Sequence, residues 1–525
     1  IPPGSPGPVV LFPPPRSIPT SICDPGFAIG DPGPLSFPSG RGDRATVPAG
    51  SRRCAIARRV VVVGGGVSGL AVTYELLQRV GPDVEVQCLE QGAHAGGNIR
   101  TDHEDGYVLE WGPNGFLDNV EATPALVRRL GLQDEVQKAD EAAAIRWIWR
   151  AGRIRRVPSS PPAFLTSDIL SWPGKLRVAM EPISGRRPEQ VDESVFEFAA
   201  RRIGRQAARV LVGAMVTGIY AGDARTLSLR ATFPKMWQME TDHGGLVKAM
   251  LAKRREARAG GDGGAGPAGP GGTLTSFRDG LATLTDGLAR AIGPALRTDR
   301  PVDAIADAGA RGFRVVLRHG APLDADAVVL ACPAWHAADL MRDADADMAE
   351  AMDGIPSAPV AVVHLGYTRS ALSPVPEGFG FLVPRGEGLR MLGTLFTSNI
   401  FPGRAPEGAF LMTTMLGGAH EPDLVERPDD ELVAIVREEL RSALTVEVAP
   451  RFVRVFRHPR GIPQYTRGHL DRVATIESRL ADHSGLHVCG NSYRGISVNL
   501  CVAEAPDVAD AVVRGLAGRG AADGA

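Results

Sequence analysis

The chain has 525 residues, with 58 Lys and Arg against 60 Asp and Glu, so its formal net charge at pH 7 is -2 and nothing points to a nucleic acid or another polyanion as partner. It contains no run of 18 or more apolar residues, which argues against a membrane-spanning helix and leaves peripheral membrane contact open. The six cysteines are scattered without metal-ligand spacing, so no metal site is expected, and a reducing cytoplasm fits them best.

The chain begins with a segment of unusual composition. Residues 1–56 are rich in Pro, Gly, Ser and Arg and show no periodic apolar pattern. Such a segment cannot bury enough apolar surface to offset its chain entropy, so we expect a disordered extension. It lacks the amphipathic pattern of a transit peptide, and its first residue is Ile1 rather than Met. We interpret it as upstream translated sequence or the result of a misplaced start, which need not belong to the working protein.

The first strong signal is a strand that runs into a glycine-rich turn. Val60–Val63 consists of four β-branched residues and predicts a buried strand. Gly64, Gly66 and Gly69 follow in the G-x-G-x-x-G spacing that opens a helix. These glycines permit a sharp turn, close approach of the backbone to a pyrophosphate, and close packing of helix on strand. The residues expected to contact a dinucleotide here are Gly64, Gly65, Gly66, Val67, Ser68 and Gly69.

The segment after the turn completes a strand–helix–strand unit. Leu70–Val80 predicts a helix that ends at Gly81, and Val84–Leu89 predicts a second strand. Glu90 ends this strand about 20 residues past the glycines, where a carboxylate accepts hydrogen bonds from a ribose hydroxyl. The whole unit therefore predicts a Rossmann-like domain with a bound dinucleotide.

Two further loops carry a resemblance to a known superfamily. Gly96–Gly97 follows Glu90, and Gly112–Pro113 comes shortly after. This pattern resembles flavin amine oxidase-like proteins, in which such loops wrap the phosphates and ribityl chain of FAD, so non-covalently bound FAD is the expected cofactor. His94 departs from the superfamily, which usually carries Arg there. The resemblance assigns further cofactor contacts to Gln91, Gly97, Asn98, Gly112, Pro113, Asn114 and Gly115 and, later in the chain, to Val302, Gly490, Ile496, Ser497 and Val498.

Within this superfamily the chain is most similar to the protoporphyrinogen oxidase family. The likeness rests on Arg146–Arg153, Gly218–Asp223, Glu377–Pro384, Ile462–Tyr465 with Gly468–His469, and Gly490–Val498. It implies FAD-dependent oxidation of protoporphyrinogen IX to protoporphyrin IX, the penultimate step of haem biosynthesis, with O2 as acceptor and H2O2 as product. The flavin breaks the bond in such chemistry, which agrees with the lack of a catalytic triad pattern.

The resemblance also assigns four substrate-side residues. Arg146 matches an arginine that pairs with a propionate, and Phe379 matches an aromatic that stacks on a pyrrole ring. Val360 matches an apolar position facing Phe379 across the macrocycle, and the backbone carbonyl of Gly218 matches a group near the reacting carbon. From the residues alone, a solvated arginine, a core phenylalanine and a turn glycine are open alternatives.

Other functions stay open. Coproporphyrinogen III oxidation uses the same flavin chemistry, and its extra propionates would need basic groups near Arg146, such as Arg150, Arg153, Arg155 and Arg156. An amine oxidase would need a lysine in the second half of the chain, and none follows Lys253. Carotenoid desaturases would not explain Ile462–Tyr465. A flavin-free binding protein, like the GDP-dissociation inhibitors, would not need the full set of glycines.

The predicted fold is α/β (α+β overall), a Rossmann-like FAD-binding domain with a mixed-sheet substrate domain and a helical membrane-associating subdomain. We expect the protein in the cytoplasm, with peripheral contact to the inner face of the cell membrane, and a homodimer is allowed. The predicted boundaries are 57–118, 273–334 and 470–518 for the FAD-binding domain, 119–222 for the helical subdomain, 223–254 and 335–469 for the substrate domain, and 255–272 for a flexible loop.

Overall fold

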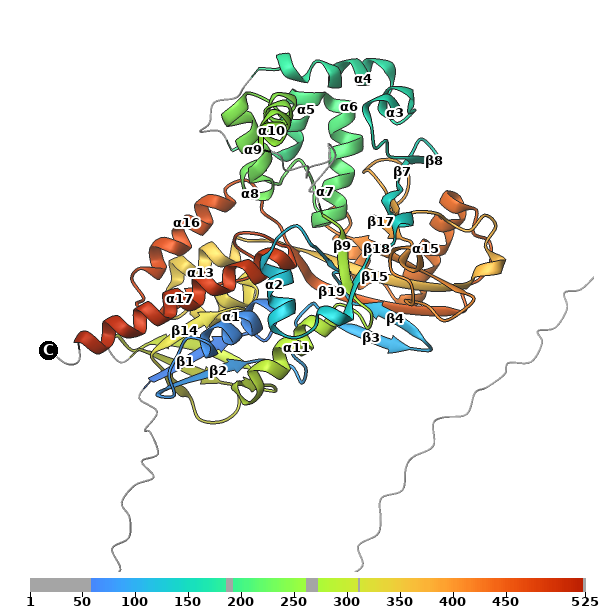
Figure 1. Ribbon diagram of the computed structural model, residues 1–525. Helices are drawn as coiled ribbons and strands as arrows, with labels where there is room; N and C mark the ends of the chain where they lie inside the picture. The colour runs from blue at the N-terminus through green and yellow to red at the C-terminus, as the bar shows by residue number, and fades with distance from the viewer. Residues whose placement is uncertain (1–57, 186–191, 261–271, 310–311, 523–525) are drawn as a thin grey trace, which may run out of the picture. The chain divides into compact units, whose positions relative to one another are not determined.

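The computed structural model describes residues 58–185, 192–260, 272–309 and 312–522 (Figure 1). The disordered extension predicted for residues 1–56 lies outside the described residues, and so do residues 261–271 of the predicted flexible loop. In the described part, α10 (Leu246–Gly260) occupies the first residues of that loop, so the boundary at residue 255 is wrong. Searched over the same residues, the helices include none with the length and apolar character that a bilayer crossing needs.

A parallel five-stranded sheet forms the cofactor end of the molecule. Its order is β10-β2-β1-β14-β20, and its strands are β1 (Arg58–Val63), β2 (Val84–Leu89), β10 (Leu296–Arg297), β14 (Ala327–Leu330) and β20 (Leu486–Val488). The four valines of β1 are almost completely buried because helices cover both faces of the sheet. The predicted strand, helix and second strand are therefore confirmed.

Each face of this sheet has its own layer. On one face lie α1 (Val67–Leu77), α2 (Ala122–Arg129), α11 (Ala282–Ile292) and α17 (Val498–Ala522). On the other face lie α12 (Ala334–Met341), α13 (Ala346–Asp353), α16 (His469–Leu480) and an antiparallel meander of β11 (Val302–Asp307), β12 (Phe313–Leu317) and β13 (Leu323–Ala325). Because α12 and α13 pack here, the boundary predicted between residues 334 and 335 does not separate two cores.

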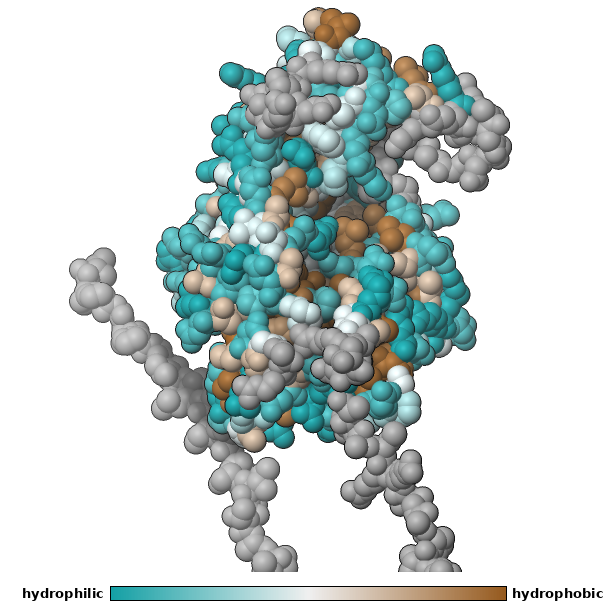
Figure 2. All heavy atoms as spheres, turned by 90° about the vertical axis from the view of Figure 1, so that its left-hand side faces the viewer, coloured by the Kyte–Doolittle hydropathy of each residue, from teal (hydrophilic) through white to brown (hydrophobic). Residues whose placement is uncertain are grey.

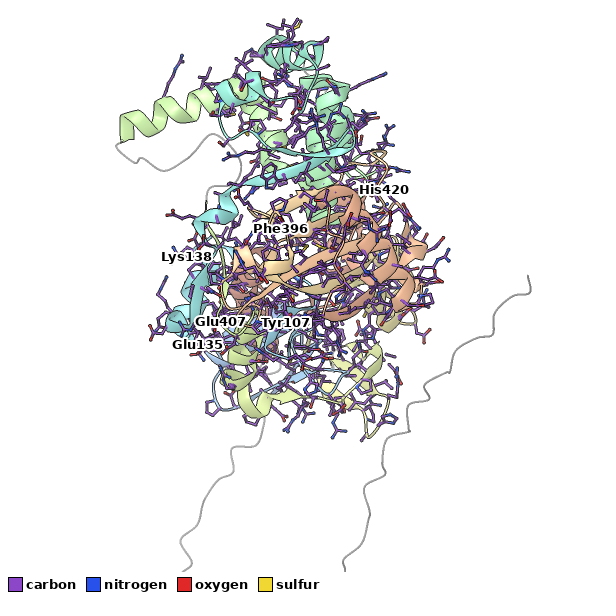
Figure 3. All side chains as sticks on the ribbon, turned by 90° about the vertical axis from the view of Figure 1, so that its right-hand side faces the viewer. Tyr107, Glu135, Lys138, Phe396, Glu407 and His420 are labelled. Atoms are coloured by element: carbon purple, nitrogen blue, oxygen red, sulfur yellow. The ribbon has the colours of Figure 1, made fainter. Side chains whose placement is uncertain are left out.

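A mixed seven-stranded sheet forms the part of the molecule predicted as the substrate domain, the substrate end. Its order is β19-β15-β18-β17-β16-β7-β8, and only the β16–β7 pair is parallel. The strands are β7 (Arg146–Arg150), β8 (Arg153–Arg156), β15 (Ser357–Thr368), β16 (Gly380–Leu382), β17 (Gly393–Leu395), β18 (Ala409–Gly417) and β19 (Phe452–Pro463). Helix α15 (Asp429–Leu444) covers one face through a core that includes Phe396 (Figure 3). The predicted mixed sheet is confirmed.

Small strands join the two ends. A hairpin of β3 (Thr101–Glu104) and β4 (Tyr107–Glu110) reaches the large sheet, where Tyr107 stacks on Phe452 with ring centroids 4.4 Å apart (Figure 3). A further sheet has the order β5-β9-β6, with β5 (Phe116–Leu117), β6 (Val136–Lys138) and β9 (Leu274–Phe277). The buried Glu110 carboxylate lies 3.3 Å from the guanidinium of Arg404, which also donates to Ser276 and so ties these strands to the loop before β18.

The helical part carries α3 to α10. Its helices are α3 (Pro161–Thr166), α4 (Trp172–Ala179), α5 (Val195–Ile203), α6 (Arg205–Ala207), α7 (Gly213–Tyr220), α8 (Leu229–Thr232), α9 (Pro234–His243) and α10, with a 3-10 turn, η3 (Glu181–Ile183), and a π-helical turn, η4 (Ala208–Val212). The interpretation of residues 119–222 as helical is wrong for β7 and β8, whose alternating Trp and Ile side chains join the large sheet.

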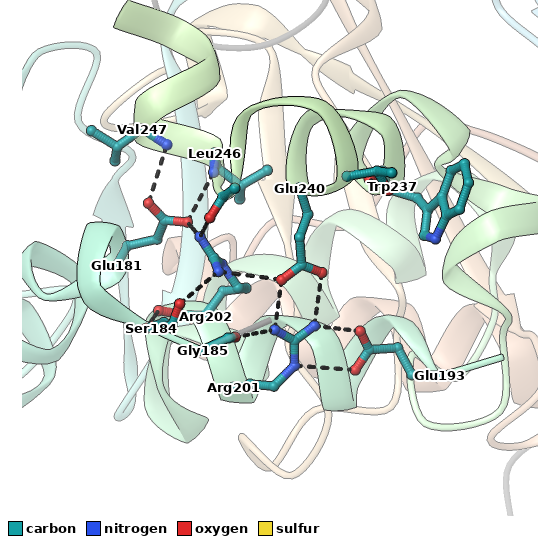
Figure 4. Close-up of polar contacts among 12 residues, drawn as sticks. Glu181, Ser184, Gly185, Glu193, Arg201, Arg202, Trp237, Glu240, Leu246 and Val247 are labelled. Atoms are coloured by element: carbon teal, nitrogen blue, oxygen red, sulfur yellow. Dashed lines mark hydrogen bonds and ion pairs between the residues drawn. The ribbon is translucent and has the colours of Figure 1, made fainter. Parts of the chain in front are cut away.

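A buried charge network holds this helical part together (Figure 4). Arg202, which is 0% exposed, pairs with Glu181 and with Glu240 at 3.2 Å. Glu181 also accepts the backbone N–H groups of Leu246 and Val247 at the start of α10. The network therefore joins η3, α5, α9 and α10 into one body, so α9 and α10, predicted in the substrate domain, belong with the helices.

Candidate active site

The glycine-rich turn lies at the carboxyl end of β1, where α1 begins. The N–H of Gly64 donates to the carbonyl of Leu89 at 2.8 Å, which fixes the turn on the end of β2. A Cβ on Gly69 would lie 1.9 Å from the Gly64 carbonyl oxygen, so helix and strand pack as closely as the glycine spacing predicts. No side chain caps the first turn of α1, whose N-cap is Gly66. Free N–H groups at a helix start suit a phosphate.

Glu90 organises the same edge of the sheet. One carboxylate oxygen accepts the N–H of Gly65 and the other accepts the N–H of Gly92, each at 2.8 Å. Each oxygen can accept a second hydrogen bond, so the carboxylate can also receive a ribose hydroxyl. The backbone of residues 299–300, just before Val302, bonds to the Glu90 and Gly92 carbonyls. The structure therefore brings Glu90 and the start of β11 together, as the adenosine half of a dinucleotide requires.

The contact between two loops without side chains tests whether FAD fits. Gly66 and Gly97 face each other so closely that a Cβ on Gly97 would lie 3.2 Å from the Gly66 Cα. The N–H of Gly96 donates to the Gly65 carbonyl at 2.8 Å and holds the two loops in register. Bare backbone on both sides, next to an uncapped helix N-terminus, fits a pyrophosphate and leaves no room for larger residues.

The C-terminal motif lies beside this contact. An added Cβ on Gly490 would lie 3.6 Å from the Ser68 Oγ, so residues far apart in sequence meet at one point. The N–H of Gly490 donates to Glu504 at 3.0 Å, and burial raises the pKa of the Glu504 carboxyl above its ordinary value. Helix α17 starts at Val498, and the Ser497 hydroxyl accepts the N–H of Leu500. The predicted cofactor residues of this motif thus lie at a second helix start.

The loop between β4 and β5 extends the same wall. A Cβ on Gly112 would lie 3.0 Å from the Asn98 carbonyl oxygen, and Asn114 donates to the Gly112 carbonyl at 3.4 Å. The side chain of Asn98 donates across to the Gly461 carbonyl of β19 at 3.4 Å. The same packing holds Gly115, whose added Cβ would lie 2.5 Å from the Thr275 carbonyl oxygen. Backbone contacts therefore connect the cofactor end to the substrate sheet.

The substrate-side residues share one face of the large sheet. In register, Ile148 of β7 lies beside Leu382 of β16, and this row continues to Val362 of β15. Because side chains alternate along a strand, Arg146 and Val360 point to the same face as this row. Figure 2 shows apolar side chains gathered in the hollow between the helical part and the sheets.

Two pairs of contacts form on this face. The guanidinium carbon of Arg146 lies 5.6 Å from the centre of the Phe379 ring, within cation–π range. Gly218 on α7 packs on Leu382, with only 2.9 Å between an added Cβ and a Leu382 methyl. Gly218 is exposed, and its neighbour Ile219 is 44% exposed, so this side of α7 borders open space. Sequence reasoning missed Leu382, although it lies within the quoted motif, between the apolar residues Phe381 and Val383.

The structure does not bring Val360 against Phe379. Three strand spacings of about 4.8 Å separate β15 from β16. Val360 packs with Ala221 and Met415, whereas Phe379 packs with Ile400 in another cluster. The two side chains can therefore meet only through a ligand that spans the sheet.

The basic residues near Arg146 already have partners. Arg150 pairs with Glu387 at 2.8 Å, and Arg153 and Arg155 both pair with Asp168. Arg156 lies opposite Trp147, so it points to the other face of the sheet. Arg146 is exposed and has no ion-pair partner among the described residues.

Other titratable groups in this region hold the fold. Burial lowers the pKa of His364 to about 4, and its neutral ring bridges the Glu110 carbonyl and the Thr413 hydroxyl. His458 donates to the Trp111 carbonyl at 2.8 Å, and the guanidinium of Arg100 lies over the Trp111 ring. Sequence reasoning missed this Trp111 contact set, whose only signal was its place in the Leu109–Gly115 motif. The described residues contain no cluster that could hold a metal ion.

Comparison with known proteins adds an independent result. A model of the family described as flavin containing amine oxidoreductase matches residues 67–513. The chloroplastic protoporphyrinogen oxidase of Nicotiana tabacum is 32% identical over 474 residues, covering 86% of this chain and 85% of the tobacco protein. The coproporphyrinogen III oxidase of Propionibacterium freudenreichii subsp. freudenreichii is also 32% identical, over 488 residues, covering 86% of this chain and 90% of that one. The crystal structure of an Exiguobacterium sp. 255-15 protein matches with a TM-score of 0.75 at 26% identity and covers 87% of this chain and 98% of that one.

Proposed function

The chain belongs to the flavin-containing amine oxidoreductase family and is an oxidoreductase whose cofactor is FAD, and we propose that it oxidises protoporphyrinogen IX to protoporphyrin IX. The proposal includes O2 as electron acceptor and H2O2 as product, and it places the reaction at the penultimate step of haem biosynthesis. The observation that carries it is the Arg146–Phe379 pair on the sheet face that also meets Gly218. A guanidinium beside a phenyl ring suits a ligand that carries both carboxylates and pyrrole rings.

The cofactor end supplies the redox chemistry. FAD held by these residues would supply the hydride acceptor, so the protein needs no acid–base pair to break a C–H bond. Gly66 and Gly97, which carry no side chains, let the pyrophosphate approach the backbone, the start of α1 faces it, and Glu90 receives the ribose. We assign the other predicted glycines of these loops to the same task. A flavin-free binding protein would have no use for this set of glycines.

The substrate end then has to bind and orient. Arg146 holds a propionate through a charge-assisted hydrogen bond, and Phe379 stacks on the adjacent pyrrole. The Gly218 carbonyl, on the exposed side of α7, lies near the carbon that loses hydrogen. Val360 contributes an apolar contact at the far side of the macrocycle, consistent with its distance from Phe379.

The ion pairs around Arg146 favour protoporphyrinogen over coproporphyrinogen. Coproporphyrinogen carries more propionate groups, each of which would need a partner. Arg150 is paired with Glu387, whereas Arg153 and Arg155 share the one carboxylate of Asp168. To bind a further propionate, Arg150 would have to give up the largely buried carboxylate of Glu387, which offsets the gain. Coproporphyrinogen III oxidation is the second candidate because a coproporphyrinogen III oxidase is among the relatives.

The helical part supports contact with a membrane surface. Trp172 is 70% and Ile183 is 76% exposed, and Leu165, Leu176 and Met180 are exposed beside them on α3, α4 and η3. Figure 2 shows apolar surface at the height where Figure 1 places these helices. Five large apolar side chains on one tip are the pattern of a peripheral membrane anchor. We place the protein in the cytoplasm, at the inner face of the cell membrane. A homodimer stays a prediction, which sedimentation would test.

Aerobic turnover tests the proposed function. The purified flavoprotein is mixed with protoporphyrinogen IX, and porphyrin fluorescence and H2O2 are measured together. Fluorescence that rises with enzyme concentration, with H2O2 formed in proportion, is the expected result. Boiled protein and the same protein with coproporphyrinogen III serve as controls. Protoporphyrinogen oxidation no faster than with boiled protein would contradict the proposal.

A further inference from the structure

The segment Gln464–His469, which connects β19 to α16, lies between the two ends of the site. On one side it contacts α7 and α8, and on the other it contacts the loop 490–497 that leads into α17. Tyr465 is 0% exposed and Gln464 is 5% exposed. A connection between two elements normally runs over the surface, so polar side chains buried in one need a reason.

The Tyr465 hydroxyl fixes the cofactor-side loop at two points. It donates to the Asn491 carbonyl at 2.6 Å and accepts the N–H of Gly495 at 2.8 Å. His469 stacks on the Tyr465 ring with centroids 4.0 Å apart and donates to the Tyr493 carbonyl at 2.8 Å. These bonds span the loop between Gly490 and Ile496, both of which were predicted to contact the cofactor.

The Gln464 amide fixes the substrate-side helix. Its Nε2 donates to the carbonyl of Tyr220, the last residue of α7, at 2.8 Å. Tyr220 follows Gly218 by two residues, so this bond holds the turn of α7 that carries Gly218. An added Cβ on Gly222 would lie 2.5 Å from the Gln464 Oε1, so the amide is also tightly packed.

Resting on the proposed function, we propose that Gln464 and Tyr465 are positioning residues that set the separation between the flavin-facing loop 490–497 and the Gly218 turn of α7. Neither residue touches the reacting atoms. Transfer of a hydride depends steeply on the distance between donor and acceptor, so a link of fixed length between the loop 490–497 and α7 controls the rate. Tyr465 fixes the loop 490–497, and Gln464 fixes the end of α7.

A matched pair of tyrosines tests the cofactor side. Tyr465→Phe removes one hydroxyl with two partners, whereas Tyr493→Phe, in the same loop, removes a buried hydroxyl with no partner among the described residues. Holoenzyme is diluted, and the release of FAD is followed by its fluorescence. We expect Tyr465→Phe to release FAD about 10-fold faster and to shift the visible flavin band. Tyr493→Phe should match the wild type.

Equal FAD release and equal spectra in the two variants would overturn the proposal. The assay contains no porphyrinogen, so its outcome is independent of whether the proposed function is right. Gln464→Met tests the link to α7, and it takes the place of the first test if Tyr465→Phe does not fold. It should lower kcat about fivefold or more while KM for the porphyrinogen and FAD release stay within about twofold, because the anchors of substrate and cofactor are untouched. An unchanged kcat would overturn the role of Gln464.

Discussion

The two ends of the site are built by different means. The cofactor end is made mostly of backbone, and the contacts of Gly64, Gly66 and Gly97 are with other backbone atoms. The substrate end is made of side chains, such as Arg146 over Phe379 and Leu382 under Gly218. Backbone cannot move aside for an extra methyl group, whereas the end of a side chain can. Cofactor binding should therefore be sensitive to added side-chain atoms, and substrate binding should be sensitive to changes of charge.

The largest effect is expected for Gly69→Ala. The new Cβ would lie 1.9 Å from the Gly64 carbonyl oxygen, and relief requires α1 to move away from β1. We expect loss of bound FAD and destabilisation by about 3 kcal/mol or more. Flavin absorbance per protein and the thermal midpoint measure both. Gly515→Ala, on α17 with open space around it, is the control and should keep its FAD. A yellow Gly69→Ala protein of normal stability would contradict the backbone account.

Arg146→Ala should have the next largest effect. A hydrogen bond to a charged group contributes about 1.5–3 kcal/mol, so KM for protoporphyrinogen should rise about 10- to 150-fold. Flavin content and kcat should change little, because the proposed role of Arg146 is to bind the macrocycle and not the cofactor. Arg153→Ala is the control, since Arg153 is exposed and pairs with the exposed Asp168. An unchanged KM in Arg146→Ala would remove Arg146 from the site.

Gly218→Ala sharpens the contrast with Gly69→Ala. Its Cβ would meet the methyl groups of Leu382 at 2.9 and 3.1 Å, which can rotate away. We expect FAD to stay bound and kcat to fall by about a factor of 10 or less. Rapid-mixing measurement of flavin reduction gives this value directly. Gly218→Ala combined with Leu382→Val should recover part of the rate, whereas loss of FAD in Gly218→Ala would show that the two ends do not differ as described.

The smallest effect is a pH dependence at the cofactor end. Burial alone would lower the pKa of His483, but its contacts with Asp307 and Asp345 raise it above the ordinary value. The folded state therefore favours the protonated imidazole. Its stabilisation is complete below the unfolded value of about 6.5 and is lost as the pH rises through the raised folded pKa. The difference in unfolding free energy between the wild type and His483→Gln should shrink over that range. A difference that grows with pH would contradict this sign.

The cofactor end could be predicted from the sequence because its signals are contiguous. Glycine spacing, the buried strand Val60–Val63 and the acid at Glu90 each act on a neighbour in the chain, and the structure places them as expected. The participation of the other loops near Gly66, which contain Gly97, Gly112 and Gly490, was predicted from the resemblance. Contacts between residues far apart in the chain, such as Gly490 and Ser68, could be found only from the structure.

The substrate end could be predicted only in part. Arg146 and Phe379 do come together, but β7 and β8 lie inside residues 119–222, which were predicted as a helical subdomain, and β7 pairs with β16 far along the chain. The ion pair between Arg150 and Glu387 joins residues 237 apart, which local patterns do not reveal. The motif Ile462–Tyr465 was recognised without a role, since its partners lie on α7 and in the loop 490–497.

Anaerobic mixing tests the central claim most directly. The yellow protein is mixed with protoporphyrinogen IX and, separately, with coproporphyrinogen III, and the loss of oxidised-flavin absorbance is recorded for the wild type and for Arg146→Ala. The account predicts fast bleaching by protoporphyrinogen, slower bleaching by coproporphyrinogen, and a shift of the protoporphyrinogen concentration dependence in Arg146→Ala. Faster bleaching by coproporphyrinogen, or none by either compound, would contradict it.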